Sequence, residues 1–515
     1  MWRALRNLIR LCGSAWILAR HGALAPLANI PQAPALALAA RFVLLFRDRR
    51  YDRLRPGERL AAALSALGPS FIKFGQSLAT RSDLIGEEQA HDLSQLQDRL
   101  KPFSAAIAKR MLEEELERPI GEVFSSFEEK PVAAASIAQV HFAVTTEGED
   151  VAVKILRPDI EKRFARDLDL FLWIAELLEE HWPWIRRLKP VEVIELFAET
   201  VEMEMDLRME AAAASELADN FADDPGFRVP NVDWSRTTAR IMTVERVRGA
   251  RIDNLEALQE MGLDPTEILR QAATAFFNQV FRDGFFHADM HPGNAFVDAQ
   301  GRVVPVDFGI MGRLDQKTRY FLADMLTGFL TGDYRKVAEV HFRAGYVPAH
   351  KSIDAFTQAC RSIGEPLLGR PLHEISVARL LAQLFRITEQ FEMETQPQLL
   401  LLQKTMVVAE GVGRTLNPDV NMWELPRPMI EDWMLQHRGP QARIKEAASH
   451  AITLAERLPQ IIEATDKVMG SMTEGGVKLH PETVARFAEE SAKRRRSFWP
   501  VWLALFIAAL ALLID

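Results

Sequence analysis

The chain has 515 residues, and its 62 Lys and Arg against 71 Asp and Glu give a formal net charge of −9, which excludes a chain-wide basic surface for nucleic acid. Its length and its 48% content of apolar residues predict two or three structural units with ordinary cores. The two cysteines, Cys12 and Cys360, suffice for neither a disulfide framework nor a zinc site and indicate a reducing compartment.

The first 47 residues differ in charge from the rest of the chain, because they hold six arginines and no Asp or Glu. Apolar residues recur there at helical spacing, and Arg3, Arg6 and Arg10 follow the neighbouring stripe. Residues 1–55 are therefore predicted to form a basic amphipathic, membrane-proximal segment suited to an anionic lipid surface. A helix packed on the rest of the protein and an organelle transit peptide are the alternatives.

Residues 56–125 show helical spacing interrupted at Gly68-Pro69, and they predict a helical extension before the first strands. The pattern then changes to alternation, which predicts a β-hairpin of residues 137–144 and 151–155. Further elements are predicted as helices over 163–180 and 191–221, strands near 227–229 and 240–244, and mostly helix over 254–490.

This order of elements, a small sheet followed by a helical body, predicts an α+β fold with two lobes. The N-lobe is expected to span residues 126–247 and the C-lobe residues 248–490.

The chain ends with an uncharged apolar run of 17 residues, 498–514, which follows the basic cluster 493–496. At about 1.5 Å per residue this run reaches roughly 25 Å, close to the hydrocarbon thickness of a bilayer. Residues 493–515 are therefore predicted to form a basic flank and a single transmembrane helix, with the body of the protein on the cytoplasmic side. The alternative is a re-entrant or dimer-packing helix.

A lysine on an apolar strand is the first feature that points to chemistry. Lys154 ends the segment VAVK on the second strand of the hairpin, and a buried ammonium group needs a partner of opposite charge. Glu210, on a predicted helix, is the candidate partner. Protein kinases use such a pair beside a strand to hold the α- and β-phosphates of ATP.

Two further segments supply the other groups that phosphoryl transfer needs. Asp289 precedes Asn294 by five residues in HADMHPGN, which provides a catalytic base or water-positioning group and a Mg²⁺ ligand from one loop. Asp307 begins a DFG segment at the end of an apolar strand and is the second expected Mg²⁺ ligand. The ordered set of VAVK, a distant Glu, D-x4-N and DFG predicts a protein kinase-like fold.

Four segments together resemble the UbiB family of atypical kinases: KFGQ at 73–76, PVAAASIAQVH at 131–141, EMDLRMEA at 204–211 and HADMHPGN at 287–294. The resemblance covers about residues 60–480. It implies a membrane-associated, kinase-like ATPase that binds ATP or ADP with Mg²⁺ and supports ubiquinone biosynthesis at the inner membrane of a bacterium. The implied partners are membrane lipids, polyprenylated quinone precursors, ubiquinone-biosynthesis enzymes and a second copy of the chain, but no nucleic acid.

The alanine-rich loop of Ala133, Ala134, Ala135 and Ser136 stands where ordinary kinases have a glycine-rich turn over the phosphates. Alanine disfavours the positive φ angles that glycine allows, so the loop should be restricted. The resemblance implies altered nucleotide selectivity and weak or absent protein phosphorylation, whereas a close-packed turn of small residues is the alternative. Glu245 is predicted to mark the hinge, whose backbone would hold adenine.

A second set of unusual residues comprises Lys73 and Gln76 of the KFGQ segment with Glu204 and Asp206. Asp206 is predicted to lie one helical turn before Glu210 and on nearly the same face. The resemblance implies that the helical extension folds over the cleft, so that Lys73 and Gln76 reach these carboxylates and exclude a protein substrate. The alternative is a solvated surface ion pair.

Three functions remain open from the sequence. The first is an ATPase or atypical kinase that acts at the membrane in ubiquinone biosynthesis. The second is a small-molecule kinase, because HADMHPGN resembles the loop of aminoglycoside and choline kinases, although those enzymes lack the KFGQ segment. The third is a nucleotide-gated lipid-binding protein with little chemistry of its own.

Overall fold

The structure, a computed structural model, describes residues 2–25, 34–79, 101–181, 189–366, 391–393 and 397–419, together with single positions within 89–100, 383–390 and 429–433. The chain divides into two units, residues 1–432 and 433–515, and every element named below belongs to the first. The predicted basic flank and transmembrane helix of residues 493–515 lie outside the described residues. Within the described ranges, none of the helices is both long enough and apolar enough to span a membrane.

The N-lobe contains an antiparallel sheet in the order β1-β3-β4-β5, and the short β2 also pairs with β3. Its strands are β1 (Phe124–Phe127), β2 (Ala133–Ala134), β3 (Ala138–Thr145), β4 (Asp150–Leu156) and β5 (Ile241–Glu245). The predicted hairpin is confirmed, because β3 and β4 pair continuously from Ala138 opposite Leu156 to Val144 opposite Asp150.

Successive side chains along β4 point to opposite faces of the sheet, and one of these faces packs in the N-lobe core. Val151, Val153 and Ile155 are buried, and they pack with Met111 and Leu112 of the helix α7 (Ala105–Leu116). The intervening residues of the strand therefore point to the opposite face of the sheet. Lys154 is one of them.

Helices before and after the sheet enclose the KFGQ segment. The helix α3 (Pro56–Leu67) ends at Gly68, whose φ of 109° interrupts the helix before α4 (Pro69–Ala79) starts. Phe74 of α4 stacks on Phe171 of α9 (Ile160–His181) with ring centroids 4.9 Å apart. The same ring lies 5.3 Å from that of Phe197 in α10 (Pro190–Glu204). The KFGQ helix is therefore held against α9 and α10 by aromatic packing.

The single helix predicted over 191–221 is wrong at one point. The helix α10 ends at Glu204, and α11 (Leu207–Asn220) begins after Asp206. Asp206 has an extended backbone (φ −109°, ψ 96°) and its carboxylate accepts the Arg208 N–H at 3.0 Å, so it is the N-cap of the second helix. A short acidic side chain competes for backbone donors in this way, which favours a cap over a helix interior.

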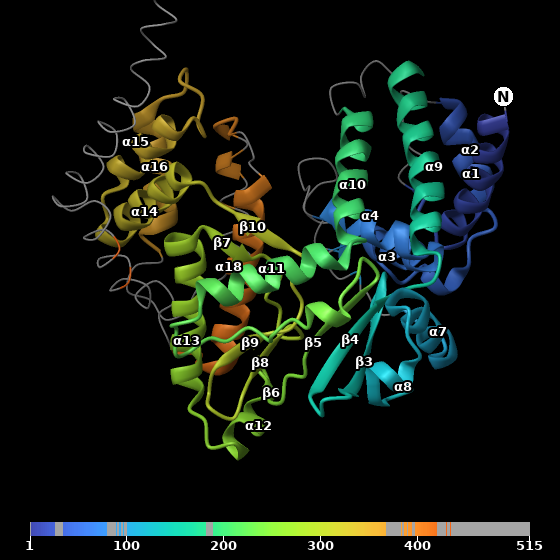
Figure 1. Cartoon of the computed structure of the whole chain (residues 1–515). Helices are drawn as coiled ribbons and strands as arrows, with labels where there is room; N and C mark the ends of the chain where they lie inside the picture. Colours follow the sequence, from blue (N-terminus) through green and yellow to red (C-terminus); the bar gives the residue numbers. More distant parts are fainter. Residues whose placement is uncertain are drawn as a thin grey trace, which may run out of the picture. The chain divides into compact units, whose positions relative to one another are not determined.

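The C-lobe is less purely helical than its sequence predicts. Its helices are α12 (Leu255–Glu260), α13 (Pro265–Phe277), α14 (Gln316–Thr331), α15 (Tyr334–Ala344), α16 (Ile353–Gly364) and α18 (Pro397–Leu416). Figure 1 shows α14, α15 and α16 packed together, while α18 contacts α13 and β10.

Short strands in the C-lobe form two further sheets, and of these strands the sequence predicted only the apolar one before Asp307, which is confirmed. The first sheet pairs β6 (Ala250–Arg251), β8 (Ala295–Val297) and β9 (Val303–Pro305), and the second pairs β7 (Phe285–His287) with β10 (Met311–Arg313). Strands of two or three residues are too short to show a two-residue period. The strand expected near 227–229 is reduced to a parallel bridge between Phe227 and Val303.

The N-terminal helix α1 (Trp2–Arg20) has its arginines turned toward the protein. Arg3 and Arg6 pair with Asp169 of α9 at 2.7 and 2.6 Å, and Arg3 also pairs with Glu176 at 3.2 Å. Of the interpretations of the N-terminal helix, packing against the rest of the protein therefore describes its basic stripe. Asp169 and Glu176, seven positions apart on α9, form ion pairs with the arginines.

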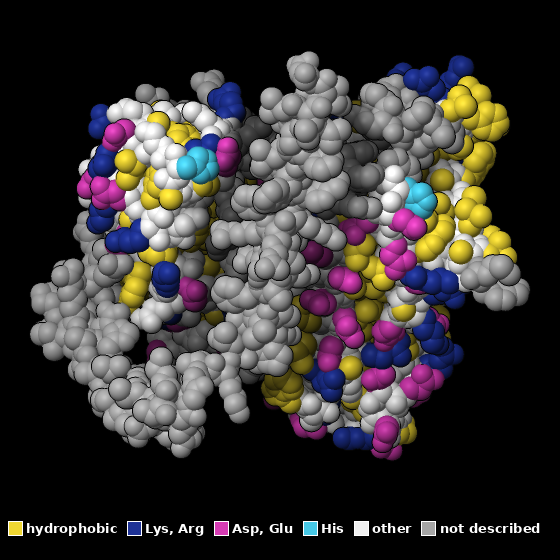
Figure 2. All heavy atoms as spheres, turned by 90° about the horizontal axis from the view of Figure 1, so that it is seen from above, with side chains coloured by type: hydrophobic (Ala, Val, Ile, Leu, Met, Phe, Trp, Pro, Cys, Tyr) yellow, Lys and Arg dark blue, Asp and Glu magenta, His cyan; other side chains and the backbone are white. Residues whose placement is uncertain are grey.

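Several apolar side chains of α1, of α2 (Pro34–Leu44) and of the two residues after it are left on the surface. Figure 2 shows apolar atoms gathered at the edge of the molecule where these helices lie. We call this surface the α1–α2 face; its half-exposed or more exposed residues are Leu5, Leu8, Ile9, Trp16, Leu38, Phe42, Leu45 and Phe46.

Candidate functional site

Lys154 lies at the centre of the candidate site. It is on β4, between Val140 of β3 and Met242 of β5, and its side chain is only 18% exposed. Its Nζ lies 2.6 Å from Glu210 Oε1 and 3.2 Å from Asp307 Oδ1. Burial opposes the charge on Lys154, but the two carboxylates outweigh it and hold the lysine pKa above its ordinary value.

The two carboxylates respond differently to this shared ammonium. Burial raises the pKa of Glu210, with the negative charge of Asp307 adding to the effect and Lys154 opposing it. Burial also opposes ionisation of Asp307, but Lys154 and the Gly309 N–H, at 3.2 Å from Oδ1, hold its pKa below the usual range. Asp307 is thus an anion at neutral pH, and its side chain is 46% exposed, so a cation can reach it.

The short strands of the C-lobe bring the catalytic-loop residues next to the DFG segment. In β8 and β9, Ala295 lies opposite Pro305, and the Val306 N–H donates to Asn294 O at 3.0 Å. Asn294 directly precedes β8 and Asp307 follows β9, so antiparallel pairing places the two residues at the same end of the ladder. The structure therefore brings the two predicted Mg²⁺ ligands together.

His287 joins the catalytic loop to the DFG segment through one neutral ring. Its Nε2 contacts the carbonyl of Asp307, while the Asp289 N–H lies 3.1 Å from its Nδ1. A ring that donates from Nε2 and accepts at Nδ1 is the neutral tautomer. Burial lowers the pKa of His287 and so favours this uncharged form.

Asn294 is oriented by a hydrogen bond to its own loop. Its amide Nδ2 donates to Asp289 O at 3.2 Å, which leaves Oδ1 as the atom that can coordinate a cation. The carboxylate of Asp307 and this amide oxygen are the hard oxygen donors that Mg²⁺ prefers, and proteins commonly hold Mg²⁺ by one or two such groups plus substrate phosphates. The described residues include no cluster of three or more His, Cys, Asp or Glu suited to a metal ion.

The alanine-rich loop is an ordered turn next to this site. Ala133 and Ala134 form β2, the Ala135 N–H donates to Ala138 O at 2.8 Å, and Arg157 donates from Nε and Nη2 to Ala135 O at 3.0 and 2.8 Å. No residue of 133–136 has a positive φ. Ser136 is fully buried, and its Oγ has no hydrogen-bond partner among the described residues.

Glu245, the predicted hinge residue, lies at the end of β5. Its N–H donates to Asn231 O at 2.8 Å, and the next N–H donates to Asp150 O at 3.0 Å. Its carboxylate forms an ion pair with Arg228 at 2.6 Å. The N–H groups of Glu245 and Arg246 are thus both engaged within the protein, and the hinge role of Glu245 stays a prediction.

The KFGQ helix reaches one of its two predicted carboxylates. Lys73 Nζ lies 2.9 Å from Glu204 Oε2, and the two side chains are 14% and 15% exposed, so this is not a solvated surface pair. Asp206 instead pairs with Arg208 at 2.7 Å, because it caps α11. Gln76 donates to Leu96 O at 3.3 Å.

One residue of the site was missed by the sequence reasoning. Lys404 of α18 places its Nζ 2.6 Å from Asp289 Oδ1, although the two residues are 115 positions apart in the chain. The sequence did contain one indication that Lys404 has a specific role, because it is the sole charged residue from 397 to 409.

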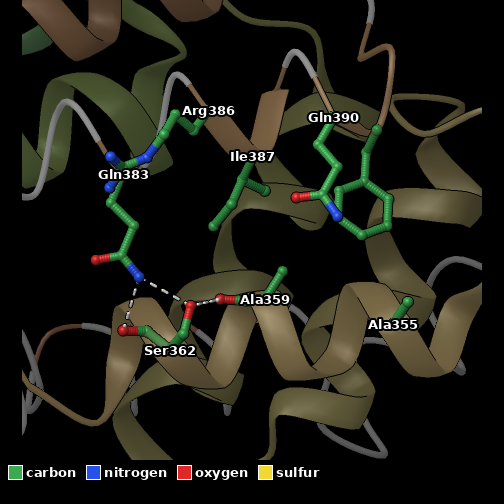
Figure 3. A pocket seen from close by; sticks show the side chains of 8 residues that line it. Ala355, Ala359, Ser362, Gln383, Arg386, Ile387 and Gln390 are labelled. Carbon is green, nitrogen blue, oxygen red and sulfur yellow. Dashed lines mark hydrogen bonds between the residues drawn. The ribbon is translucent and has the colours of Figure 1, made fainter.

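A pocket of about 530 Å³ lies in the helical region and contains none of the predicted site residues. It is lined by Ala355, Ala359, Ser362, Gln383, Arg386, Ile387, Gln390 and Phe391. Figure 3 shows the Gln383 amide donating to the Ser362 carbonyl and hydroxyl, at 3.1 and 2.9 Å. The pocket has no described contact with the groups around Lys154.

The burial of the Lys73–Glu204 pair predicts a large cost when one partner is removed. Lys73→Met should lower the free energy of unfolding by about 3 kcal/mol, because the Glu204 carboxylate then stays buried without its ammonium. Lys73→Met combined with Glu204→Leu should recover much of that loss in urea denaturation. Lys189→Met, in an exposed pair with Glu192, is the control and should cost under about 1 kcal/mol. Equal losses in the single variant and the control would contradict the burial argument.

The neutral ring of His287 predicts a specific pH dependence of stability. The unfolded state takes up the proton near pH 6.5 while the buried ring resists it, so stability is lost as the pH falls from about 7 through the lower pKa of the folded state. His287→Gln should flatten this slope by up to about 1.4 kcal/mol per pH unit in urea melts at pH 5–7. Part of the slope should remain, because burial also lowers the pKa values of His141 and His341.

Comparison with known proteins places this geometry in a family. Residues 95–341 match the model of the ABC1 atypical kinase-like domain, and residues 360–421 match that of the UbiB helical domain. A solved Mycobacterium tuberculosis protein in complex with erythromycin is similar at a TM-score of 0.50 and 25% identity, covering 68% of this chain and 90% of that one. The kinase-like α+β fold expected from the sequence is therefore supported.

Curated relatives named "Probable protein kinase UbiB" match most of the chain. The protein from Marinobacter nauticus is 39% identical over 516 residues, which cover 99% of this chain and 94% of that protein. The one from Aliivibrio fischeri is 41% identical over 439 residues, covering 84% and 80%, and that from Cellvibrio japonicus is 39% identical over 486 residues, covering 93% and 88%. The chain therefore belongs to the UbiB family of atypical kinase-like proteins.

Proposed function

We propose that this protein is a Mg²⁺-dependent ATPase or atypical kinase that works at the cytoplasmic face of a bacterial inner membrane in support of ubiquinone biosynthesis. The observation that carries the proposal is the ion-pair cluster of Lys154, Glu210 and Asp307. An ammonium fixed beside a strand, next to an exposed anionic carboxylate, suits the phosphates of ATP and the Mg²⁺ that accompanies them.

Each residue of the site has a distinct part in this proposal. Lys154, oriented by Glu210, holds the α- and β-phosphates, while Asp307 and Oδ1 of Asn294 hold Mg²⁺, which neutralises charge on the phosphates when bound. Asp289 orients the attacking oxygen and accepts its proton. The buried Ser136 hydroxyl supplies a further hydrogen bond beside the alanine-rich loop.

The presence of the KFGQ helix favours a phosphoryl acceptor that is a small molecule or water and disfavours a protein substrate, as the family resemblance implies. The Lys73–Glu204 pair ties α4 to the end of α10, six residues before Glu210. We assign Lys73, Gln76, Glu204 and Asp206 a regulatory part. Lys73 and Glu204 join α4 to α10, neither of which carries a group of the phosphate site, and Asp206 caps α11, which carries Glu210. The KFGQ helix also disfavours the small-molecule kinase alternative, since those kinases lack the KFGQ segment.

ATP hydrolysis by the purified full-length chain in detergent or with anionic vesicles tests the proposal. Asp307→Asn should lower the rate by about 100-fold or more, because the carboxylate that holds Mg²⁺ is lost. Asp159→Asn, at a surface site that is 73% exposed, is the matched control and should keep the wild-type rate. A wild type that hydrolyses no ATP, or an unchanged Asp307→Asn, would contradict the enzyme proposal.

The second candidate function is a nucleotide-gated lipid-binding protein, which is favoured by the exposed α1–α2 face. Profiling of polyprenylated quinone precursors in a deletion strain separates the two. Rescue of normal profiles by Asp289→Asn would support lipid binding without chemistry, whereas failure of that variant to rescue would support the enzyme.

We further propose that the α1–α2 face lies on the membrane. Phe42 and Leu45 are 65% and 77% exposed, and Trp16 contributes an aromatic ring beside Phe46 at 5.5 Å. Contiguous exposed apolar surface of this kind marks a membrane or protein interaction site. The amphipathic helix would thus meet lipid with its apolar side, while its arginines stay bound to α9.

The two cysteines provide a direct test of this membrane contact. Cys12 is exposed on α1, whereas Cys360 is buried and its pKa is raised to about 12, so a thiol-reactive fluorophore should label Cys12 selectively at neutral pH. Vesicles with phosphatidylglycerol should shift the label's emission to the blue. The double variant Phe42→Ser/Leu45→Ser should reduce the shift severalfold, and Trp234→Ser should not. A shift that depends on protein concentration alone would instead indicate a second copy on this face.

A further inference from the structure

The contact between Lys404 and Asp289 joins two parts of the chain that match separate family models. Asp289 lies within residues 95–341 of the kinase-like match, and Lys404 lies within residues 360–421 of the helical match. Their side chains meet at 2.6 Å, with Lys404 42% and Asp289 25% exposed. The kinase-like part alone therefore does not contain every charged group at the site.

The charges of the site show what this lysine adds. The catalytic loop 287–294 contains no Lys or Arg, and Lys154 is already shared by Glu210 and Asp307. Without Lys404, three carboxylates, including Asp289, face one ammonium. A nucleotide triphosphate would bring further negative charge, and phosphoryl transfer spreads that charge over the three equatorial oxygens of the terminal group. A second ammonium near Asp289 meets this requirement.

The position of α18 fixes where the second ammonium can act. The helix packs against α13 and against β10, and β10 pairs with β7 immediately before the catalytic loop. Asp289 is itself held by the His287 ring and by Asn294, both of which bond its backbone. The carboxylate of Asp289 thus has a fixed backbone, and the flexible stem of Lys404 approaches it from the helical region.

We propose that Lys404 is a ligand of the terminal phosphate of the nucleotide, supplied to the site by the helical domain. This inference rests on the function proposed above and deepens it. With no nucleotide, the ammonium pairs with Asp289; with a triphosphate, it also binds the terminal phosphoryl group, and with a diphosphate it has no phosphate to bind there. The helical domain would therefore distinguish the triphosphate from the diphosphate through this one side chain.

Nucleotide binding by the full-length chain in detergent tests this proposal without relying on turnover. Isothermal titration should compare Mg-AMP-PNP, a non-hydrolysable triphosphate, with Mg-ADP. Lys404→Met should weaken AMP-PNP binding about tenfold or more and ADP binding by less than about twofold, because only the triphosphate loses a charge-assisted hydrogen bond. Lys404→Arg should restore most of the AMP-PNP affinity.

A matched control and a second variant make the result decisive. Lys162→Met removes a lysine from an exposed lysine–aspartate pair on α9 and should leave both affinities unchanged. Asp289→Asn frees Lys404 from its partner, so AMP-PNP binding should be kept or tightened. If Lys404 instead serves only to position Asp289, then Lys404→Met and Asp289→Asn should change the two affinities alike.

The outcomes separate this inference from the proposed function. A wild type that binds both nucleotides, together with a Lys404→Met variant that loses both equally or neither, would overturn the role of Lys404 and leave the nucleotide site standing. A wild type that binds neither nucleotide would overturn both. Selective loss of AMP-PNP binding, with rescue by arginine, would support the proposal.

Discussion

The arrangement of both lobes depends on how the chain accommodates one ammonium group in its central sheet. A lysine on an inner strand is tolerated only when opposite charges replace its water shell. Lys154 obtains them from Glu210 on α11 and from Asp307 after β9. Three segments far apart in the sequence must therefore meet at one point. The packing of α11 on the sheet brings Glu210 to Lys154, and the position of the DFG segment brings Asp307 to it.

Segments from outside the kinase-like region reach toward the same centre by ion pairs. From the N-terminal side, α4 contributes Lys73 to Glu204; from the C-terminal side, α18 contributes Lys404 to Asp289. A buried or half-buried pair is costly to break from one side only. Ion pairs therefore hold both α4 and α18 to the kinase-like region. An ion pair fixes the position of its two partners more specifically than an apolar contact does.

The sequence predicted those parts of the fold and the site that depend on residues close together in the chain. It did not predict the parts that depend on a single tertiary contact. The hairpin around Lys154 and the order of the D-x4-N and DFG segments follow from residues close together in the chain. The break at Asp206 was not predicted, because the helical spacing continues across it, and an Asp that favours a cap does not by itself mark where one helix ends. The pairing of Lys404 with Asp289 depends on tertiary packing, which no spacing encodes. The strands of the C-lobe other than the one before Asp307 were missed because they are too short to show a period.

The hydrogen bonds from Arg157 to the alanine-rich loop have a consequence for the proposed nucleotide site. Arg157 lies outside the loop, yet its guanidinium holds both the Ala135 carbonyl and the carbonyl of Lys101, the latter at 3.0 Å. Enzymes with a mobile flap over the phosphates often release product only as fast as the flap opens. A turn pinned at its backbone works as a fixed wall instead. If the protein binds ATP as proposed, nucleotide exchange would then depend on rearrangement of the ion pairs around Lys154 rather than on opening of this loop.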